Sequence, residues 1–276
     1  MIFIVYLSGY IILLYLAKNR IIVGMSMKNL SKISILTLVF TLLFPLMLVA
    51  SHKTCEFEFA GASTLNFEKN LITETDTVPS RNYTVVIDAG HGGSDPGSIG
   101  YKTKVRESDL NLKLSKMLQN KLESAGINVV MTRTTDDSLV EGSGKKWKKK
   151  DMEKRKELIK QIRPNMVISI HQNSYTNHSL RGAQVFYDKT SDISRQIAES
   201  IQEEFKSSLD HGNKYASPGD YFMLKCTYAP SVIVECGFLS NEAEEKLLIS
   251  PEYQEKITNC IYIGVIKFLQ TPNGKK

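Results

Sequence analysis

The chain has 276 residues, of which 42% are hydrophobic, and its formal net charge is +6. This composition excludes a low-complexity or repeat protein and supplies enough apolar residues for one sizeable core. The modest positive excess suits an anionic polymer or a membrane surface, but no nucleic-acid-binding motif accompanies it, so we expect no nucleic acid among the partners.

Two apolar stretches, residues 1–17 and 33–50, begin the chain with a short basic connector between them. Neither stretch has a polar face, which favours a signal peptide or an uncleaved signal anchor over a buried core helix. We therefore interpret residues 1–50 as a hydrophobic signal or anchor region, in which residues 1–24 are a mis-chosen start if translation begins at Met25. No Ala-x-Ala cleavage motif is evident, so a membrane tether is favoured over release. We expect the remainder of the chain to be exported.

Residues 51–82 are rich in Ser, Thr, Asn, Glu and Lys without a sustained period, which is typical of a linker. Beyond them, residues 83–270 are expected to form one folded domain, with residues 271–276 as a tail. The four cysteines are too few for a disulfide scaffold. A bridge between Cys226 and Cys236 is open outside the cytoplasm, although two inert buried thiols are the favoured interpretation.

Strand-like and helix-like patterns alternate from residue 83 onward. Apolar runs predict strands at residues 84–88, 128–132, 166–171, 183–187, 221–224 and 232–235. Helical periodicity predicts helices at residues 108–125, 151–162, 191–209 and 251–269, with Ser108 as an N-cap, Gly126 as a stop and Pro251 in a first turn. The alternation predicts a single three-layer α/β/α domain around a mostly parallel sheet of about six strands.

Residues 145–160 are densely basic and are interrupted by Trp147 and a few acidic residues. We interpret most of this segment as a solvated helix and the loop before it. Electrostatic contact with an anionic polymer or lipid is the alternative.

Polar residues follow three of the predicted strands at the point where each strand ends. His91 comes just after the first strand, His171 ends the third, and Glu235 closes the Val-Ile-Val run of the last. In an open α/β sheet, ligands gather at the carboxyl ends of the strands. Glycines on both sides of His91 let the backbone turn sharply and approach a ligand closely. We therefore expect these three side chains to meet at one rim of the sheet.

A catalytic zinc ion takes three protein ligands, imidazoles and carboxylates, and leaves a fourth position for water. His91 and His171 supply the nitrogens, so one carboxylate must come from elsewhere in the chain. Glu107 stands immediately before a helix and is placed to reach back over the loop. Asp109 competes with it, but suits the first helical turn and its positive dipole end. The pattern therefore predicts one zinc ion per chain, with Glu107 as the favoured third ligand.

Four motifs match a known family in order along the chain. They are Ile-Asp-Ala-Gly-His-Gly-Gly at 87–93, Glu-Ser-Asp-Leu-Asn-Leu at 107–112, Ser-Ile-His-Gln-Asn at 169–173 and Val-Glu-Cys-Gly-Phe-Leu-Ser-Asn at 234–241. On these motifs the chain resembles the zinc-dependent N-acetylmuramoyl-L-alanine amidases. Its N-terminal hydrophobic segment and its lack of added wall-binding modules are most similar to the CwlD-type amidases of endospore formers.

The resemblance implies that His91, Glu107 and His171 bind zinc and that Glu235 is the catalytic carboxylate. It implies hydrolysis of the amide between the lactyl group of N-acetylmuramic acid and the first L-alanine of the stem peptide of peptidoglycan. In the CwlD-type enzymes this reaction strips peptides so that the muramic-δ-lactam of spore cortex forms. Some relatives need a companion protein, so an accessory activating protein is a candidate partner.

Three more residues are candidates for substrate binding or for support of the ligands. Asp88 would orient an imidazole or cap the loop. Arg106 would meet either a stem-peptide carboxylate or a surface ion-pair partner. Asn173 shares the strand face of His171 and would either bond substrate or brace the loop. The same alternation turns Cys236 away from the metal, which disfavours a thiol nucleophile.

Two other kinds of function stay open. A zinc carboxypeptidase or other peptidase also uses two histidines and a glutamate, but there the first His and Glu lie close together, whereas His91 and Glu107 are well separated. A non-catalytic wall-binding protein with a vestigial site is the second alternative. It is disfavoured because all three presumed ligands and Glu235 are present.

Overall fold

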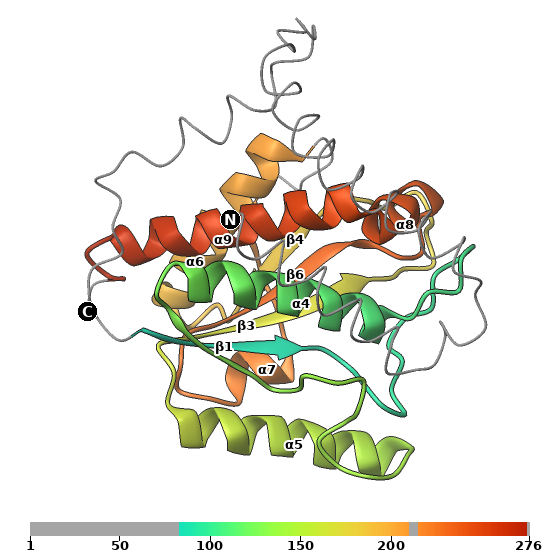
Figure 1. Ribbon diagram of the computed structural model, residues 1–276, viewed down its shortest axis with the longest axis horizontal. Helices are drawn as coiled ribbons and strands as arrows, with labels where there is room; N and C mark the ends of the chain where they lie inside the picture. Colours follow the sequence, from blue (N-terminus) through green and yellow to red (C-terminus); the bar gives the residue numbers. More distant parts are fainter. Residues whose placement is uncertain (1–82, 210–214, 275–276) are drawn as a thin grey trace, which may run out of the picture. The chain divides into compact units, whose positions relative to one another are not determined.

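The computed structural model describes residues 83–209 and 215–274 (Figure 1), so the signal or anchor region and the linker predicted at residues 1–82 lie outside the described residues. Within the described ranges, no helix combines the length and the apolar character needed to cross a membrane. These residues form an α/β/α sandwich around one sheet, which confirms the predicted fold class.

The six-stranded sheet of the middle layer has the order β2-β1-β3-β6-β4-β5. Its strands are β1 (Thr84–Ala89), β2 (Asn128–Met131), β3 (Met166–Asn173), β4 (Gln184–Tyr187), β5 (Ser217–Pro218) and β6 (Ser231–Phe238). Strands β2, β1, β3 and β6 run parallel to one another, whereas β4 runs antiparallel to β6. The carboxyl ends of β1, β3 and β6 therefore lie side by side at one edge of the sheet.

The helices of the described residues are α4 (Glu107–Ser124), α5 (Lys145–Ile162), α6 (Asp192–Ser208), α7 (Phe222–Lys225), α8 (Glu242–Ile249) and α9 (Pro251–Gln270). Figure 1 shows α4 and α9 on one face of the sheet and α5 and α7 on the other. As predicted, Gly126 follows the end of α4 with a φ of +79°, and Pro251 begins α9.

Alternation along the strands divides the core into two unequal clusters. Val85 of β1 belongs to the larger cluster, beneath α4, α6 and α9, whereas Val86 belongs to the smaller cluster beneath α5 and α7. Because side chains alternate with a period of two, Asp88 follows Val86 to the α5 face. His171 and Glu235, which continue the series of Val167 and Ile233, lie on that same face. The polar strand ends thus open toward α5 and α7.

The strand predicted at residues 221–224 is wrong, because Phe222–Lys225 form the helix α7. The strand that brings the sheet to six is instead β5, which was not predicted from the sequence. A run of four apolar residues carries no period that separates a strand from a helix. The consecutive residues Met223 and Leu224 are both buried in the smaller cluster. Two consecutive side chains of a helical turn can both pack into one core cluster, whereas consecutive side chains of a strand point to opposite faces of the sheet.

Two more elements differ from the sequence prediction. Helix α5 begins at Lys145, well before the predicted Asp151, and Trp147 in its first turn is buried and donates its indole N–H to the Val140 carbonyl at 2.7 Å. Helix α8 has no counterpart among the predicted elements. Its start is fixed by Asn241, whose side chain accepts hydrogen bonds from two backbone N–H groups of the first turn.

Ser108 was predicted to cap α4, but it lies inside that helix, and Arg106 occupies the N-cap position without a side-chain capping bond. The backbone N–H groups of Glu107 and Ser108 instead donate to the carbonyls of Ser98 and Pro96, at 2.9 and 3.0 Å. These bonds satisfy donors that a helix start leaves unpaired. The loop after β1 therefore caps the helix whose first residue is Glu107.

Asp88 and Arg155 form a buried ion pair beneath the carboxyl edge of the sheet. Arg155 Nη1 donates to Asp88 Oδ1 at 2.8 Å, and the hydroxyls of Thr132 and Ser169 also donate to the Asp88 carboxylate. Burial raises the pKa of Asp88, but Arg155 and the two hydroxyls outweigh it and hold the pKa at about 2. Asp88 thus joins the sheet to α5 through these bonds, rather than through the imidazole or loop cap suggested by the sequence.

We expect Asp88→Asn to destabilise the protein by about 3–5 kcal/mol at pH 7, because it leaves the buried Arg155 without its counter-charge. The folded pKa of Asp88 lies below that of an unfolded chain, so the carboxylate stabilises the fold fully above about pH 4 and loses this contribution as the pH falls toward 2. Urea unfolding of both proteins at pH 7 and pH 3 measures the difference, which should shrink at pH 3. Asp220→Asn, at the exposed pair with Lys225, is the control, and an equal effect of both substitutions would contradict this account.

Candidate metal centre

His91, Glu107 and His171 converge at the carboxyl edge of the sheet, with one ligand atom of each lying within 4.8 Å of the others. His91 Nε2 and His171 Nδ1 face Glu107 Oε1 at 3.1 and 3.0 Å. The two imidazoles meet edge to face, with ring centroids 4.9 Å apart. The three residues come from the loop after β1, the start of α4 and the end of β3. This group can hold a metal ion.

Two glycines make room for the cluster. A Cβ atom on Gly90 would overlap the imidazole of His171. At Gly97 the φ is +67°, and a Cβ atom would lie 2.6 Å from Glu107 Oε2 and 2.8 Å from the His91 ring. Only glycine supplies both the left-handed backbone and the missing side chain that this position requires.

His91 itself has a left-handed backbone, with a φ of +62°, and two buried arginines hold the strand end and the loop that carries it. Arg155 from α5 donates to the His91 carbonyl at 2.6 Å. Arg133, which follows β2, donates to the carbonyls of Ala89 and Gly90 at 2.9 and 3.0 Å. A non-glycine residue in this conformation is strained and needs surrounding structure to fix it. The arginines supply that structure.

Asp95 orients His91 from the side opposite Glu107. Its Oδ2 lies 2.8 Å from His91 Nδ1, and its Oδ1 accepts a hydrogen bond from the Gly97 N–H. A carboxylate on the outer nitrogen fixes the ring and the tautomer of a metal-binding histidine. Asp95 was not predicted from the sequence, although an acidic residue four positions after the histidine in the same loop was a usable signal.

Glu107 is buried and its carboxylate is well supplied with donors. Oε2 accepts from the Ser98 N–H at 2.8 Å, and Oε1 accepts from the Gln172 N–H at 3.1 Å. Burial raises the pKa of Glu107, but hydrogen bonds with His171 and His91 hold it well below its usual range. Burial lowers the pKa of His91, yet Asp95 and Glu107 raise it to about 9. Glu107 is thus ionised between the two imidazoles, and a metal ion that binds here would take the place of the proton held on His91.

Glu235 lies beside this cluster because its strand, β6, pairs with β3 in a register that places it opposite His171. Its side chain is buried, with 8% of the residue exposed, and Oε2 has no hydrogen-bond partner among the described residues. Burial, and to a lesser extent the Glu107 charge, raise the pKa of Glu235 to about 7, against the opposing effect of the two histidines. Such a group can take up and release a proton near neutral pH.

Glu235 and the three clustered residues line one cavity of about 520 Å³, together with Asn173 and Tyr221. A register shift between β3 and β6 separates His171 from Asn173, whose Oδ1 accepts from the Ser174 N–H. Arg106 is absent from the lining of this cavity and pairs instead with Asp136 at 3.1 Å.

The remaining candidates lie apart from the cluster. Asp109 is exposed in the first turn of α4, as its predicted dipole role requires. Cys236 is buried in the larger core cluster, on the face opposite Glu235, and both Cys226 and Cys236 are free thiols. His178 bonds the Ser240 carbonyl, while His52 and His211 lie outside the described residues.

The fold and the cluster define an α/β/α protein with a candidate metal centre and a buried carboxylate beside it, an arrangement that suits hydrolysis. Residues 85–267 match the N-acetylmuramoyl-L-alanine amidase family, and the chain belongs to that family. It is therefore an amidase that acts on peptidoglycan.

The relatives agree with this assignment. The germination-specific N-acetylmuramoyl-L-alanine amidase of Bacillus subtilis is 32% identical over 197 residues, which cover 70% of this chain and 82% of that protein. The CwlD amidase of Clostridioides difficile, solved in complex with the GerS lipoprotein, is 40% identical with a TM-score of 0.65 and covers 68% of this chain and 98% of its own. An N-acetylmuramoyl-L-alanine amidase of Clostridium difficile 630 is 29% identical with a TM-score of 0.63, over 70% of this chain and 100% of its own.

Proposed function

We propose that this amidase matures spore cortex, by cleaving the amide between the lactyl group of N-acetylmuramic acid and L-alanine so that muramic-δ-lactam forms. The observation that carries the chemistry is the presence of Glu235 in one cavity with His91, Glu107 and His171. The cortex role is supported by the likeness to the germination-specific and CwlD amidases.

The ion that fits this centre best is zinc. Its usual protein ligands in hydrolases are imidazole nitrogens and carboxylate oxygens, and His91, His171 and Glu107 supply three. Asp95 adds the supporting carboxylate that zinc-binding histidines commonly have. A bound zinc ion lowers the pKa of water and polarises an amide carbonyl.

Glu235 is the proposed proton carrier. Its carboxylate accepts a proton from the attacking water as the water oxygen bonds to the lactyl carbonyl carbon. It then delivers that proton to the amide nitrogen as the carbon–nitrogen bond breaks. The products are a free lactyl carboxylate on the glycan and a stem peptide with a free L-alanine amine.

Location and partners follow from the substrate. We propose that the chain is exported and that residues 1–50 direct or anchor it, because peptidoglycan lies outside the cytoplasmic membrane. The CwlD amidase was solved with a lipoprotein partner, which supports an accessory protein of that kind here.

Digestion of purified peptidoglycan with the full chain and zinc tests the reaction. We expect mass spectrometry to find whole stem peptides with a free L-alanine amine, together with glycan strands whose lactyl carboxyl groups are free. Release of a single terminal amino acid, with muramic acid still substituted, would instead indicate a peptidase and contradict the proposal.

A further inference from the structure

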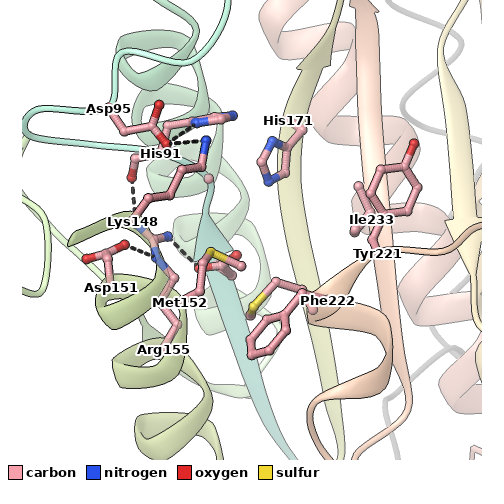
Figure 2. A pocket seen from close by; sticks show the side chains of 13 residues that line it. His91, Asp95, Lys148, Asp151, Met152, Arg155, His171, Tyr221, Phe222 and Ile233 are labelled. Atoms are coloured by element: carbon pink, nitrogen blue, oxygen red, sulfur yellow. Dashed lines mark hydrogen bonds and ion pairs between the residues drawn. The ribbon is translucent and has the colours of Figure 1, made fainter. Parts of the chain in front are cut away.

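A second, smaller cavity of about 140 Å³ adjoins the metal centre between α5 and α7 (Figure 2). It shares His91, His171, Tyr221 and Lys148 with the larger cavity, so the two form one continuous site. Figure 2 shows Lys148 reaching from α5 on one side and Tyr221 and Phe222 on the opposite side. A substrate held at the metal centre therefore passes between these walls.

Two cationic side chains, Arg155 and Lys148, line the smaller cavity, and they differ in how many of their hydrogen-bond donors are already engaged. Arg155 is buried and is engaged by Asp88, Asp151 and two backbone carbonyls. Lys148 is 54% exposed, and Asp95 is its one ion-pair partner among the described residues, at 2.8 Å. An ammonium group has three N–H donors, so Lys148 retains donors for an incoming anion.

The chemistry of the substrate identifies that anion. The lactyl carboxyl of muramic acid is consumed in the scissile amide, so the free carboxylates near this bond belong to the stem peptide. Opposite Lys148, the wall is formed by Tyr221, Phe222, Met223 and Ile233, which suits the apolar parts of a peptide. A lysine facing an apolar wall matches a short peptide that carries a carboxylate.

We propose that Lys148 determines substrate specificity by binding a carboxylate of the stem peptide. This inference rests on the proposed function. Asp95 holds the ammonium at the rim of the site, and the peptide carboxylate takes the remaining donors. The enzyme then favours stem peptides in which the residue after L-alanine has a free carboxylate. Stem peptides in which that carboxylate is converted to an amide are poorer substrates.

Kinetics on two synthetic muramoyl peptides test this inference. The peptides are identical except that the free carboxylate of the residue after L-alanine is an amide in one of them. We expect the zinc-loaded full chain to prefer the free carboxylate about tenfold in kcat/KM, mainly through KM, as one charge-assisted hydrogen bond allows. Lys148→Met should reduce this preference to near one, and Lys148→Arg should restore most of it.

Lys149→Met is the matched control, because Lys149 is an exposed neighbour on α5 and is absent from the lining of both cavities. It should keep the wild-type preference. An unchanged preference in Lys148→Met, or none in the wild type, would overturn the inference. Equal losses on both peptides with reduced zinc content would assign Lys148 to supporting Asp95 instead. Failure of the wild type to cleave either peptide would contradict the proposed function itself.

Discussion

Glu235→Gln should lower kcat by at least about 10²–10⁴-fold, while the protein keeps its fold and its zinc. The amide side chain preserves the shape of the carboxylate but cannot accept the proton of the attacking water, and proton transfer of this kind contributes a factor of that order. Glu235 is buried, so bulk solvent is poorly placed to substitute for it. The measurement is the rate of stem-peptide release at saturating substrate, together with zinc content by elemental analysis.

Glu242→Gln is a suitable control, because Glu242 is half exposed and pairs with Lys246 on the surface of α8. It should leave the rate unchanged. Turnover of Glu235→Gln at the wild-type rate would remove Glu235 from the mechanism. Loss of zinc in that variant would move its role from proton transfer to support of the metal centre.

His171→Ala should lose both metal and activity. The substitution removes one of two imidazoles from the cluster, and Glu107 loses a partner that lies 3.0 Å away. Loss of an outer partner of a metal ligand already costs roughly 10–100-fold in affinity, so loss of a ligand should cost more. Competition with a zinc chelator measures the affinity, and zinc content after gel filtration should fall well below one per chain.

His178→Ala separates this effect from the general loss of a histidine, because His178 bonds the Ser240 carbonyl and is not part of the cluster. It should retain zinc. A His171→Ala protein that binds one zinc ion with wild-type affinity would show that the ion is held elsewhere.

The parts of the site that follow strand ends could be predicted from the sequence. His91, His171 and Glu235 each follow a short run of buried apolar residues, and parallel strands bring such ends to one edge. The role of Glu107 as a ligand was harder to predict, because its position depends on the loop that caps α4. The preference for Glu107 over Asp109 rested on its place immediately before the predicted helix.

The supporting residues could not be predicted, because their roles depend on contacts between distant parts of the chain. Arg155 stands in a basic segment that resembles a solvated helix, yet it is buried against Asp88, 67 positions earlier. Arg133 carries no local signal that it binds the carbonyls of Ala89 and Gly90. Lys148 could be assigned to the site only after α5 was located beside β1.

The arginine bonds to the loop after β1 have a consequence for how the ion enters the protein. Arg133 and Arg155 donate to the carbonyls of Gly90 and His91, so contacts within the protein itself hold the loop that carries His91. Uptake therefore costs little ordering of the chain, in contrast to small domains that fold only when the metal arrives. We therefore expect the metal ion to be removed and added back reversibly, without unfolding of the protein.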